Sequence, residues 1–186
     1  MNIRVLLVDD HAVVRDGLRA LLERLTAAPP QRVLEIGTSK GGTLYLFCRV
    51  ATPTATLVTV DLPGAWLRGH YPRWKDGLYR SFAGPQQTVV TMGGDSHSAA
   101  TARQVESCFG GQPIDFLFID GDHSYDACKA DIAAWAPFAR RGGVMAFHDF
   151  GSRAEGVTRA IFEEIRAGRF AEIVGVAGTI IAFRMQ

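Results

Sequence analysis

Two short apolar runs in the second half of the sequence each end in a group of acidic and histidine side chains. The runs are residues 116–119 and 143–147, and a segment of helix length lies between them. The polar residues that follow the two runs are Asp120, Asp122, His123, His148 and Asp149. Parallel strands joined by a helix have their carboxyl ends at the same edge of a sheet, where open α/β sheets bind ligands. The sequence therefore predicts an α/β sheet with these side chains gathered on one rim.

The composition is that of an ordinary globular chain. Of the 186 residues, 47% are hydrophobic and 21% are charged, so we expect a single sizeable core. A formal net charge of +1 provides no strong attraction for nucleic acid or for an anionic membrane, and no apolar run approaches the roughly 20 residues of a membrane span. The three cysteines are widely spaced, which argues against a disulfide framework or a zinc cluster and favours a reducing cytoplasm. A homo-oligomer remains open.

Strand-like and helix-like segments alternate along most of the chain. Short apolar, β-branched runs predict strands, and apolar residues at helical spacing predict helices. The expected strands are residues 3–8, 32–36, 57–60, 88–92, 116–119 and 143–147, and the expected helices are residues 12–25, 43–50, 99–109, 125–136 and 156–167. Residues 173–176 and 180–183 predict a closing antiparallel hairpin. This alternation predicts a doubly wound, mostly parallel α/β sheet.

A glycine-rich loop follows the strand predicted at residues 32–36. Glycines there let the backbone approach a ligand closely and turn into a helix whose N–H groups face the ligand. The next two strands each end in an acid: Asp61 can accept both hydroxyl hydrogens of a ribose, and Asp95 with Ser96 could meet an adenine amino group. The candidate cofactor-binding residues are Glu35, Gly37, Thr38, Ser39, Gly41, Gly42, Asp61, Leu62, Asp95 and Ser96. These ordered signals predict a nucleoside-type cofactor.

The pattern E-x-G-x-x-x-G-G at residues 35–42, followed by Asp61 and Asp95, resembles the class I S-adenosylmethionine-dependent methyltransferases. The similarity runs from about residue 21 to the C-terminus, and the loop differs from the G-x-G-x-x-G dinucleotide pattern. The resemblance implies S-adenosyl-L-methionine as cofactor and a Rossmann-like, seven-stranded sheet with a reversed last strand, which the predicted hairpin matches. We assign residues 27–186 to this methyltransferase domain.

Within that family, D-G-D-H-S-Y at residues 120–125 and the later His-Asp pair resemble a subgroup of small O-methyltransferases and sugar- or antibiotic-tailoring enzymes. The resemblance implies Asp120 and Asp149 as ligands of Mg²⁺ or another divalent cation, His123 as general base, and a small-molecule hydroxyl as acceptor. A hard cation lowers the pKa of a bound oxygen, and a histidine can take its proton. His148 departs from the pattern, because relatives often carry an acid there and histidine suits softer metals. It remains a candidate third ligand, a second base or a neutral hydrogen-bonding residue.

Residues 63–85 mix glycine, proline, aromatic and cationic residues and fit no strand or helix of the alternating pattern. A stretch of this length is rarely structureless inside a compact domain. We expect a partly helical insertion over the rim, a candidate lid with substrate contacts. The alternative is a surface excursion whose aromatic side chains pack on the core.

Several other polar residues have structural interpretations. Asp122 could cap the helix that follows it, and His97 could line the pocket, cap a helix or face solvent. Solvent-facing positions are predicted for Asp126, Lys129, Asp131, Arg103, Arg140, Arg141, Arg153, Arg159 and Arg169.

The first 23 residues resemble the start of response-regulator receiver domains, in which an acid pair binds Mg²⁺ beside a phospho-accepting aspartate. The resemblance implies Asp9 and Asp10 as the acid pair and Asp61 as a mimic of the acceptor. It then fails, because the chain lacks a convincing lysine at the strand end where a receiver needs one. We expect residues 1–26 to be a receiver-like strand and helix without a working phosphorylation site.

The sequence as a whole predicts an O-methyltransferase that uses S-adenosyl-L-methionine. The alternative from another class is a non-catalytic signalling or binding module that retains a receiver-like start. An RNA methyltransferase is disfavoured by the near-zero net charge and by the lack of an appended RNA-binding domain.

Overall fold

The computed structural model describes residues 12–62, 74–152 and 155–186, over which strands and helices alternate as predicted. The strands are β1 (Arg32–Ile36), β2 (Thr56–Asp61), β3 (Thr88–Gly93), β4 (Ile114–Ile119), β5 (Ala139–Phe147), β6 (Phe170–Ala177) and β7 (Ile180–Met185). The helices are α1 (Ala12–Ala27), α2 (Gly42–Val50), α3 (Trp74–Arg80), α4 (Ala99–Cys108), α5 (Tyr125–Trp135) and α6 (Glu155–Arg166), with the 3-10 turn η1 (Ala136–Phe138) after α5. The strand predicted at residues 3–8 and the acids Asp9 and Asp10 lie outside the described residues.

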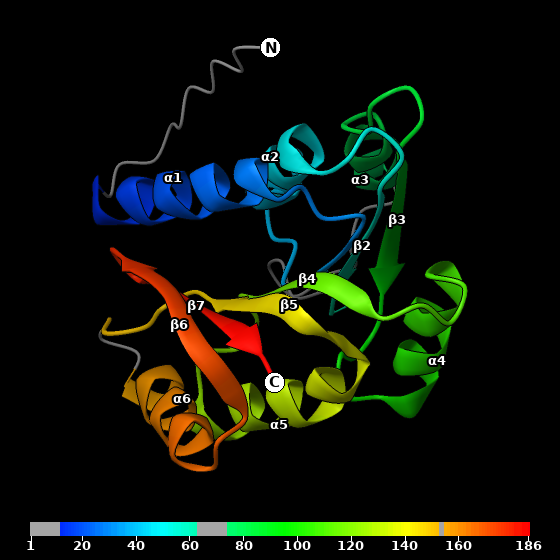
Figure 1. Cartoon of the computed structure of the whole chain (residues 1–186). Helices are drawn as coiled ribbons and strands as arrows, with labels where there is room; N and C mark the ends of the chain where they lie inside the picture. Colours follow the sequence, from blue (N-terminus) through cyan, green and yellow to red (C-terminus); the bar gives the residue numbers. More distant parts are fainter. Residues whose placement is uncertain (1–11, 63–73, 153–154) are drawn as a thin grey trace.

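The seven strands form one sheet in the order β3-β2-β1-β4-β5-β7-β6 (Figure 1). The first five in that order run parallel, whereas β7 is antiparallel to β5, and β6 is antiparallel to β7. The predicted Rossmann-like sheet with its closing hairpin is confirmed. The chain winds outward from β1 to β3 on one side and from β4 to β5 on the other, so the topological switch point lies between β1 and β4. Open α/β sheets bind ligands beside such a point.

Helices cover both faces of the sheet and bury a core on each (Figure 1). On one face α4, α5 and α6 contribute to a core that includes the buried Trp135, and on the other α1, α2 and α3 contribute to a core that includes the buried Tyr79. Successive strand residues point to opposite faces, so Leu117 of β4 joins the first core and Phe118 joins the second. Every residue of β4 is buried. The carboxyl end of this central strand is therefore held from both sides.

Strand β5 begins earlier than the strand predicted at residues 143–147. Its first part pairs with β4 across an irregularity between Ile114 and Phe116. The first residues of β5 include two arginines, so the apolar pattern did not predict them as strand. Arg140 is exposed, as predicted for a surface charge, and it places its Nε 2.8 Å from Oδ1 of Asp115.

Helix α1 confirms the helix predicted at residues 12–25. It packs against β6, β7 and α2. Its buried residues include Leu18, Leu21, Leu22 and Leu25, which share a core with β1. Within the described ranges, no helix combines the length and apolarity needed to cross a membrane.

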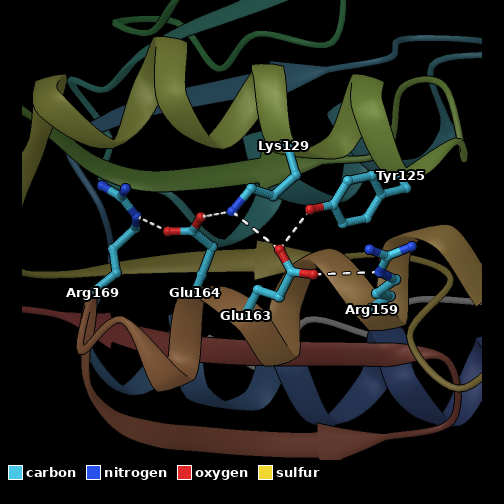
Figure 2. A network of polar contacts seen from close by, with 6 residues as sticks. All are labelled: Tyr125, Lys129, Arg159, Glu163, Glu164 and Arg169. Atoms are coloured by element: carbon cyan, nitrogen blue, oxygen red, sulfur yellow. Dashed lines mark hydrogen bonds and ion pairs between the residues drawn. The ribbon is translucent and has the colours of Figure 1, made fainter.

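A polar network joins α5 to α6 (Figure 2). Lys129 forms an ion pair with the buried Glu164 and places its Nζ 3.8 Å from Oε2 of Glu163, while Arg169 pairs with the other oxygen of Glu164. The hydroxyl of Tyr125 donates to Glu163 over 2.5 Å. Although burial raises the pKa of Glu164, its hydrogen bonds from Arg169 and Lys129 hold that pKa below its ordinary value. Lys129 and Arg169 keep partly exposed side chains, as expected for solvated charges, but α6 also brings carboxylates to them that the sequence pattern did not predict.

We predict that Gly156→Ala destabilises the fold and that Gly77→Ala does not. A Cβ on Gly156, in α6, would lie 2.5 Å from the backbone nitrogen of Tyr125 and 3.0 Å from the carbonyl oxygen of His123, whereas one on Gly77, in α3, would meet nothing within 4 Å. Overpacking costs about 1–3 kcal/mol, and alanine gains up to ~1 kcal/mol over glycine in an open helical position. Urea unfolding followed by circular dichroism measures both changes. A Gly156→Ala variant as stable as the wild type would contradict the packing of α6 on this turn.

Candidate active site

The residues that follow β1, β4 and β5 continue the hydrogen-bond ladder of the sheet onto one rim. The backbone N–H groups of Gly37, Asp120 and His148 donate to carbonyls of neighbouring strands over 2.8, 2.9 and 3.1 Å respectively. The sheet therefore fixes the start of each segment, and the polar side chains are presented from rigid positions.

The glycine loop, residues 37–42, lies directly against the acidic turn, residues 120–123. Gly37 has a φ of 91°, and a Cβ there would lie 2.0 Å from the carbonyl oxygen of Asp120. No side chain fits at that distance, so only glycine allows the two segments to touch. Ser39 is also left-handed, with a φ of 45°, and the loop then turns into α2.

Helix α3, the described helix of the insertion predicted at residues 63–85, covers the glycine loop. The hydroxyl of Tyr79 donates to the carbonyl of Ser39 over 2.8 Å, and a Cβ on Gly41 would lie 2.4 Å from the Tyr79 ring. Tyr79 is buried and Phe82 packs beside it. In this part of the insertion, Tyr79 and Phe82 pack on the core. The part that would test a lid lies outside the described residues.

Glu35 lies at the end of β1, beneath the glycine loop, and is fully buried. Thr59 donates to its Oε2 over 2.7 Å, Thr43 donates to its other oxygen, and the hydroxyl of Thr38 lies 2.5 Å from that of Thr59. Burial raises the pKa of Glu35 to about 8, against the opposing effect of the two threonine hydrogen bonds. Glu35 and Thr38 thus support the loop from below, and neither is exposed at the rim.

Carboxylates stand at the ends of β2 and β3 beside the loop. Asp61 accepts the N–H of Ser39 over 3.0 Å with one oxygen and the N–H of Leu62 over 2.8 Å with the other. Asp95 accepts the N–H of His97 over 2.9 Å. Backbone donors hold these carboxylates in place, and each oxygen keeps a further lone pair for a ligand.

Asp120, His123 and Asp149 converge at the carboxyl ends of β4 and β5. One candidate ligand atom from each lies within 4.8 Å of the other two. Nε2 of His123 is 3.0 Å from Oδ2 of Asp149 and 4.0 Å from Oδ1 of Asp120. The rim expected from the sequence is therefore formed, and its two carboxylates and imidazole are a donor set that suits a divalent cation.

His148 lies between the two carboxylates of this group. Its Nδ1 is 3.3 Å from Oδ1 of Asp120 and 3.0 Å from Oδ2 of Asp149, and its Nε2 is 3.4 Å from the hydroxyl of Thr179. Burial acts to lower the pKa of His148, but hydrogen bonds to the two carboxylates outweigh it and raise the pKa to about 10. The hydrogen bond from His148 holds the pKa of Asp149 below its ordinary value. Asp149 has a φ of 61° and turns the chain sharply at this point.

Asp122 lies outside this group and orders the turn before α5. Its exposed carboxylate accepts the N–H of Ser124 over 2.7 Å. Ser124 is the N-cap of α5, since its hydroxyl accepts the N–H of Ala127 over 3.3 Å. The structural interpretation of Asp122 thus holds, although the cap itself is Ser124.

Asp131 is a polar residue that the sequence pattern misplaces. It is predicted to face solvent, but its side chain is only 2% exposed. The hydroxyl of Ser96 donates to its Oδ1 over 2.7 Å, and Nε2 of His97 lies 3.2 Å from the same oxygen. Helical spacing could have indicated that Asp131 is buried, because it falls three residues after Cys128 and four before Trp135, which are both buried.

A family model described as a methyltransferase domain matches residues 34–150, a span that holds the glycine loop, the acidic turn and the His-Asp pair. The chain belongs to this methyltransferase family. A curated relative, an uncharacterised protein y4gI from Sinorhizobium fredii, is 26% identical to this chain over 137 residues. The match covers 70% of this chain and 14% of the relative, so the chain spans a small part of that protein's length.

Solved structures share the fold of this methyltransferase domain. The O-methyltransferase from Bacillus cereus in complex with S-adenosylhomocysteine has a TM-score of 0.67 at 18% identity, over 94% of this chain and 82% of that one. CalS11, a TDP-rhamnose 3′-O-methyltransferase of calicheamicin biosynthesis, has a TM-score of 0.66 at 18% identity, over 90% and 78%. MycE, from the mycinamycin biosynthetic pathway, in complex with Mg, S-adenosylhomocysteine and mycinamycin VI, has a TM-score of 0.60 at 18% identity, over 89% and 47%. Such similarity establishes a class I methyltransferase fold.

We predict that Glu35→Gln stabilises the fold relative to the wild type as the pH rises. The pKa of Glu35 rises from 4.5 to about 8 on folding. The folded protein therefore keeps a proton that the unfolded chain releases, and the wild type loses stability as the pH rises from 4.5 towards 8. Glutamine lacks this titration.

Urea unfolding at about pH 5 and about pH 8 measures the effect, because these values bracket most of the titration. The free energy of unfolding of Glu35→Gln minus that of the wild type should increase by at least ~1 kcal/mol between them. The exposed Glu106→Gln serves as control. An unchanged difference would contradict the raised pKa of Glu35.

Proposed function

We propose that this methyltransferase domain transfers a methyl group from S-adenosyl-L-methionine to a hydroxyl group of a small molecule, with a divalent cation and a histidine base. The observation that carries the proposal is the contact of the glycine loop with the acidic turn. A cofactor on the loop would lie beside Asp120, His123 and Asp149, whose candidate ligand atoms lie within 4.8 Å of one another.

The proposed cofactor site is the glycine loop together with the acids at the ends of β2 and β3. Its proposed residues are Gly37, Ser39, Gly41, Gly42, Asp61, Leu62, Asp95 and Ser96, with the buried Glu35 and Thr38 supporting the loop from below. Asp61 would hold the ribose hydroxyls, and Asp95 with Ser96 would meet the adenine. The fixed carboxylate of Asp61 and the start of α2 behind Gly41 support this assignment. When bound, S-adenosyl-L-methionine supplies a methyl group already activated on a sulfonium.

The proposed cation ligands are Asp120 and Asp149, with His148 as a third donor beside them. Two converging carboxylates fit a hard cation such as Mg²⁺, while the imidazole also admits a softer metal. When bound there, the cation would supply Lewis acidity that lowers the pKa of an acceptor hydroxyl. His148 lies 3.3 and 3.0 Å from the two carboxylates, which supports its assignment to the same group. It would bind the cation only after releasing the proton that these carboxylates favour.

His123 is the proposed general base. Its side chain is 55% exposed, so an acceptor can reach it. With Nε2–H donated to Asp149, 3.0 Å away, the free lone pair lies on Nδ1. Nδ1 would take the hydroxyl proton as the acceptor oxygen bonds to the methyl carbon and the methyl–sulfur bond breaks, which releases S-adenosylhomocysteine. Asp149 would stabilise the imidazolium that forms.

Proteins that share this fold and act on or bind small molecules support a small-molecule acceptor. CalS11 is a TDP-rhamnose 3′-O-methyltransferase, and MycE was crystallised with Mg and mycinamycin VI. We propose a ring-bearing acceptor of the sugar or polyketide kind. The insertion at residues 63–85 would contribute contacts to it.

We predict that His123→Gln and Asp120→Asn lower methyl transfer by about 100-fold or more and change the affinity for S-adenosylhomocysteine by less than about threefold. Both side chains act on the acceptor, whereas the cofactor is held by the glycine loop. Isothermal titration with S-adenosylhomocysteine measures the affinity. Transfer of labelled methyl to a panel of sugar-nucleotide and polyketide hydroxyls measures turnover. Asp126→Asn, an exposed acid on α5, is the control and should retain both.

Failure of the wild type to bind S-adenosylhomocysteine at millimolar concentration would overturn the proposal. Binding without transfer to any acceptor would favour the non-catalytic binding module. Turnover that persists after treatment with a chelator would remove the divalent cation alone.

A further inference from the structure

The buried carboxylate of Asp131 reaches from α5 to the β3–α4 loop, residues 94–98, on the side of the sheet where adenine is proposed to bind. Its Oδ1 accepts the hydroxyl of Ser96 over 2.7 Å and lies 3.2 Å from Nε2 of His97. A buried charge is costly unless it is hydrogen-bonded. Burial raises the pKa of Asp131, and the bonds from Ser96 and His97 oppose that rise.

The second oxygen of Asp131 faces the acidic turn. A Cβ on Gly121 would lie 3.2 Å from Oδ2 of Asp131. Asp95 holds the other side of His97, since it accepts the His97 N–H over 2.9 Å and lies 3.7 Å from Nδ1. Asp131 therefore lies between the β3–α4 loop, to which it is hydrogen-bonded, and the acidic turn, and both segments flank the proposed cofactor site.

This geometry determines what the Ser96 hydroxyl can offer a ligand. A hydroxyl has one proton to donate and two lone pairs. Ser96 donates its proton to Asp131, and a carboxylate can only accept. Ser96 is only partly buried. Towards a ligand it presents lone pairs alone.

We propose that Asp131 is a positioning residue that fixes the Ser96 hydroxyl as an acceptor, and that the site thereby selects a nucleobase with an exocyclic amino group over one with a carbonyl. The inference rests on the proposed function, because it needs the nucleoside of the cofactor beside Ser96. Adenine offers an N–H donor to this hydroxyl. Hypoxanthine offers a carbonyl oxygen, which would oppose the lone pairs of Ser96.

The test compares S-adenosylhomocysteine with S-inosylhomocysteine, which differ at the base alone. Isothermal titration gives the ratio of the two dissociation constants for each variant. The wild type should favour S-adenosylhomocysteine by about tenfold or more, because a mispaired polar group is strongly penalised. In Asp131→Ala the hydroxyl can rotate and donate to the carbonyl, so the ratio should fall severalfold. The exposed Asp126→Ala, on the same helix, should keep the wild-type ratio.

A double-mutant cycle shows whether Asp131 acts through Ser96. Ser96→Ala should lower the ratio by itself, and adding Asp131→Ala should then change it little further. Asp131→Leu, which fills the same space without an acceptor, replaces Asp131→Ala if the smaller side chain prevents folding.

An unchanged ratio in Asp131→Ala or in Ser96→Ala would overturn the inference, as would fully additive effects in the double variant. If Asp131 only stabilised the local structure, its replacement would weaken the binding of both ligands equally and leave the ratio of their dissociation constants unchanged. Failure of the proposed function is distinct, since the wild type would then bind neither ligand.

Discussion

The parallel pairing of β1 with β4 is the constraint on which the rest of the molecule depends. It places the end of the glycine-loop strand next to the end of the acidic-turn strand at the switch point of the sheet. The absence of a side chain at Gly37 then lets the loop touch the carbonyl of Asp120. The proposed cofactor site and the proposed catalytic group of Asp120, His123 and Asp149 therefore lie on either side of one backbone contact.

Buried acids lie behind the rim as well as on it. Glu35 lies under the glycine loop and Asp131 behind the β3–α4 loop, and burial raises the pKa of both. Each is satisfied by neighbouring hydroxyl groups, which is the condition for burying such a group. At the rim the pKa shift has the opposite direction, because the hydrogen bond from His148 lowers the pKa of Asp149 and keeps that carboxylate charged. The same residue type thus serves as a support below the loops and as a candidate ligand above them.

The sequence predicts the elements well because their apolar periodicity is strong and each strand ends at a distinct polar signal. Asp61, Asp120 and Asp149 could be placed on one rim from the parallel topology alone. Asp131 could not be placed with the same ease, because its partners Ser96 and His97 come from a loop about 35 residues earlier in the chain. Lys129 was missed for a similar reason, since its carboxylate partners come from α6. Side-chain pairing between distant segments is set by tertiary packing, which local patterns do not report.

The most direct test of the account is a crystal structure of the protein soaked with S-adenosylhomocysteine and Mn²⁺, with the anomalous signal of the metal recorded. The account predicts S-adenosylhomocysteine along the glycine loop with its ribose on Asp61, and a metal peak bound by Asp120 and Asp149. Ligand density elsewhere, or a rim that binds neither molecule, would contradict the claim that this contact of loop and turn is a methyl-transfer site.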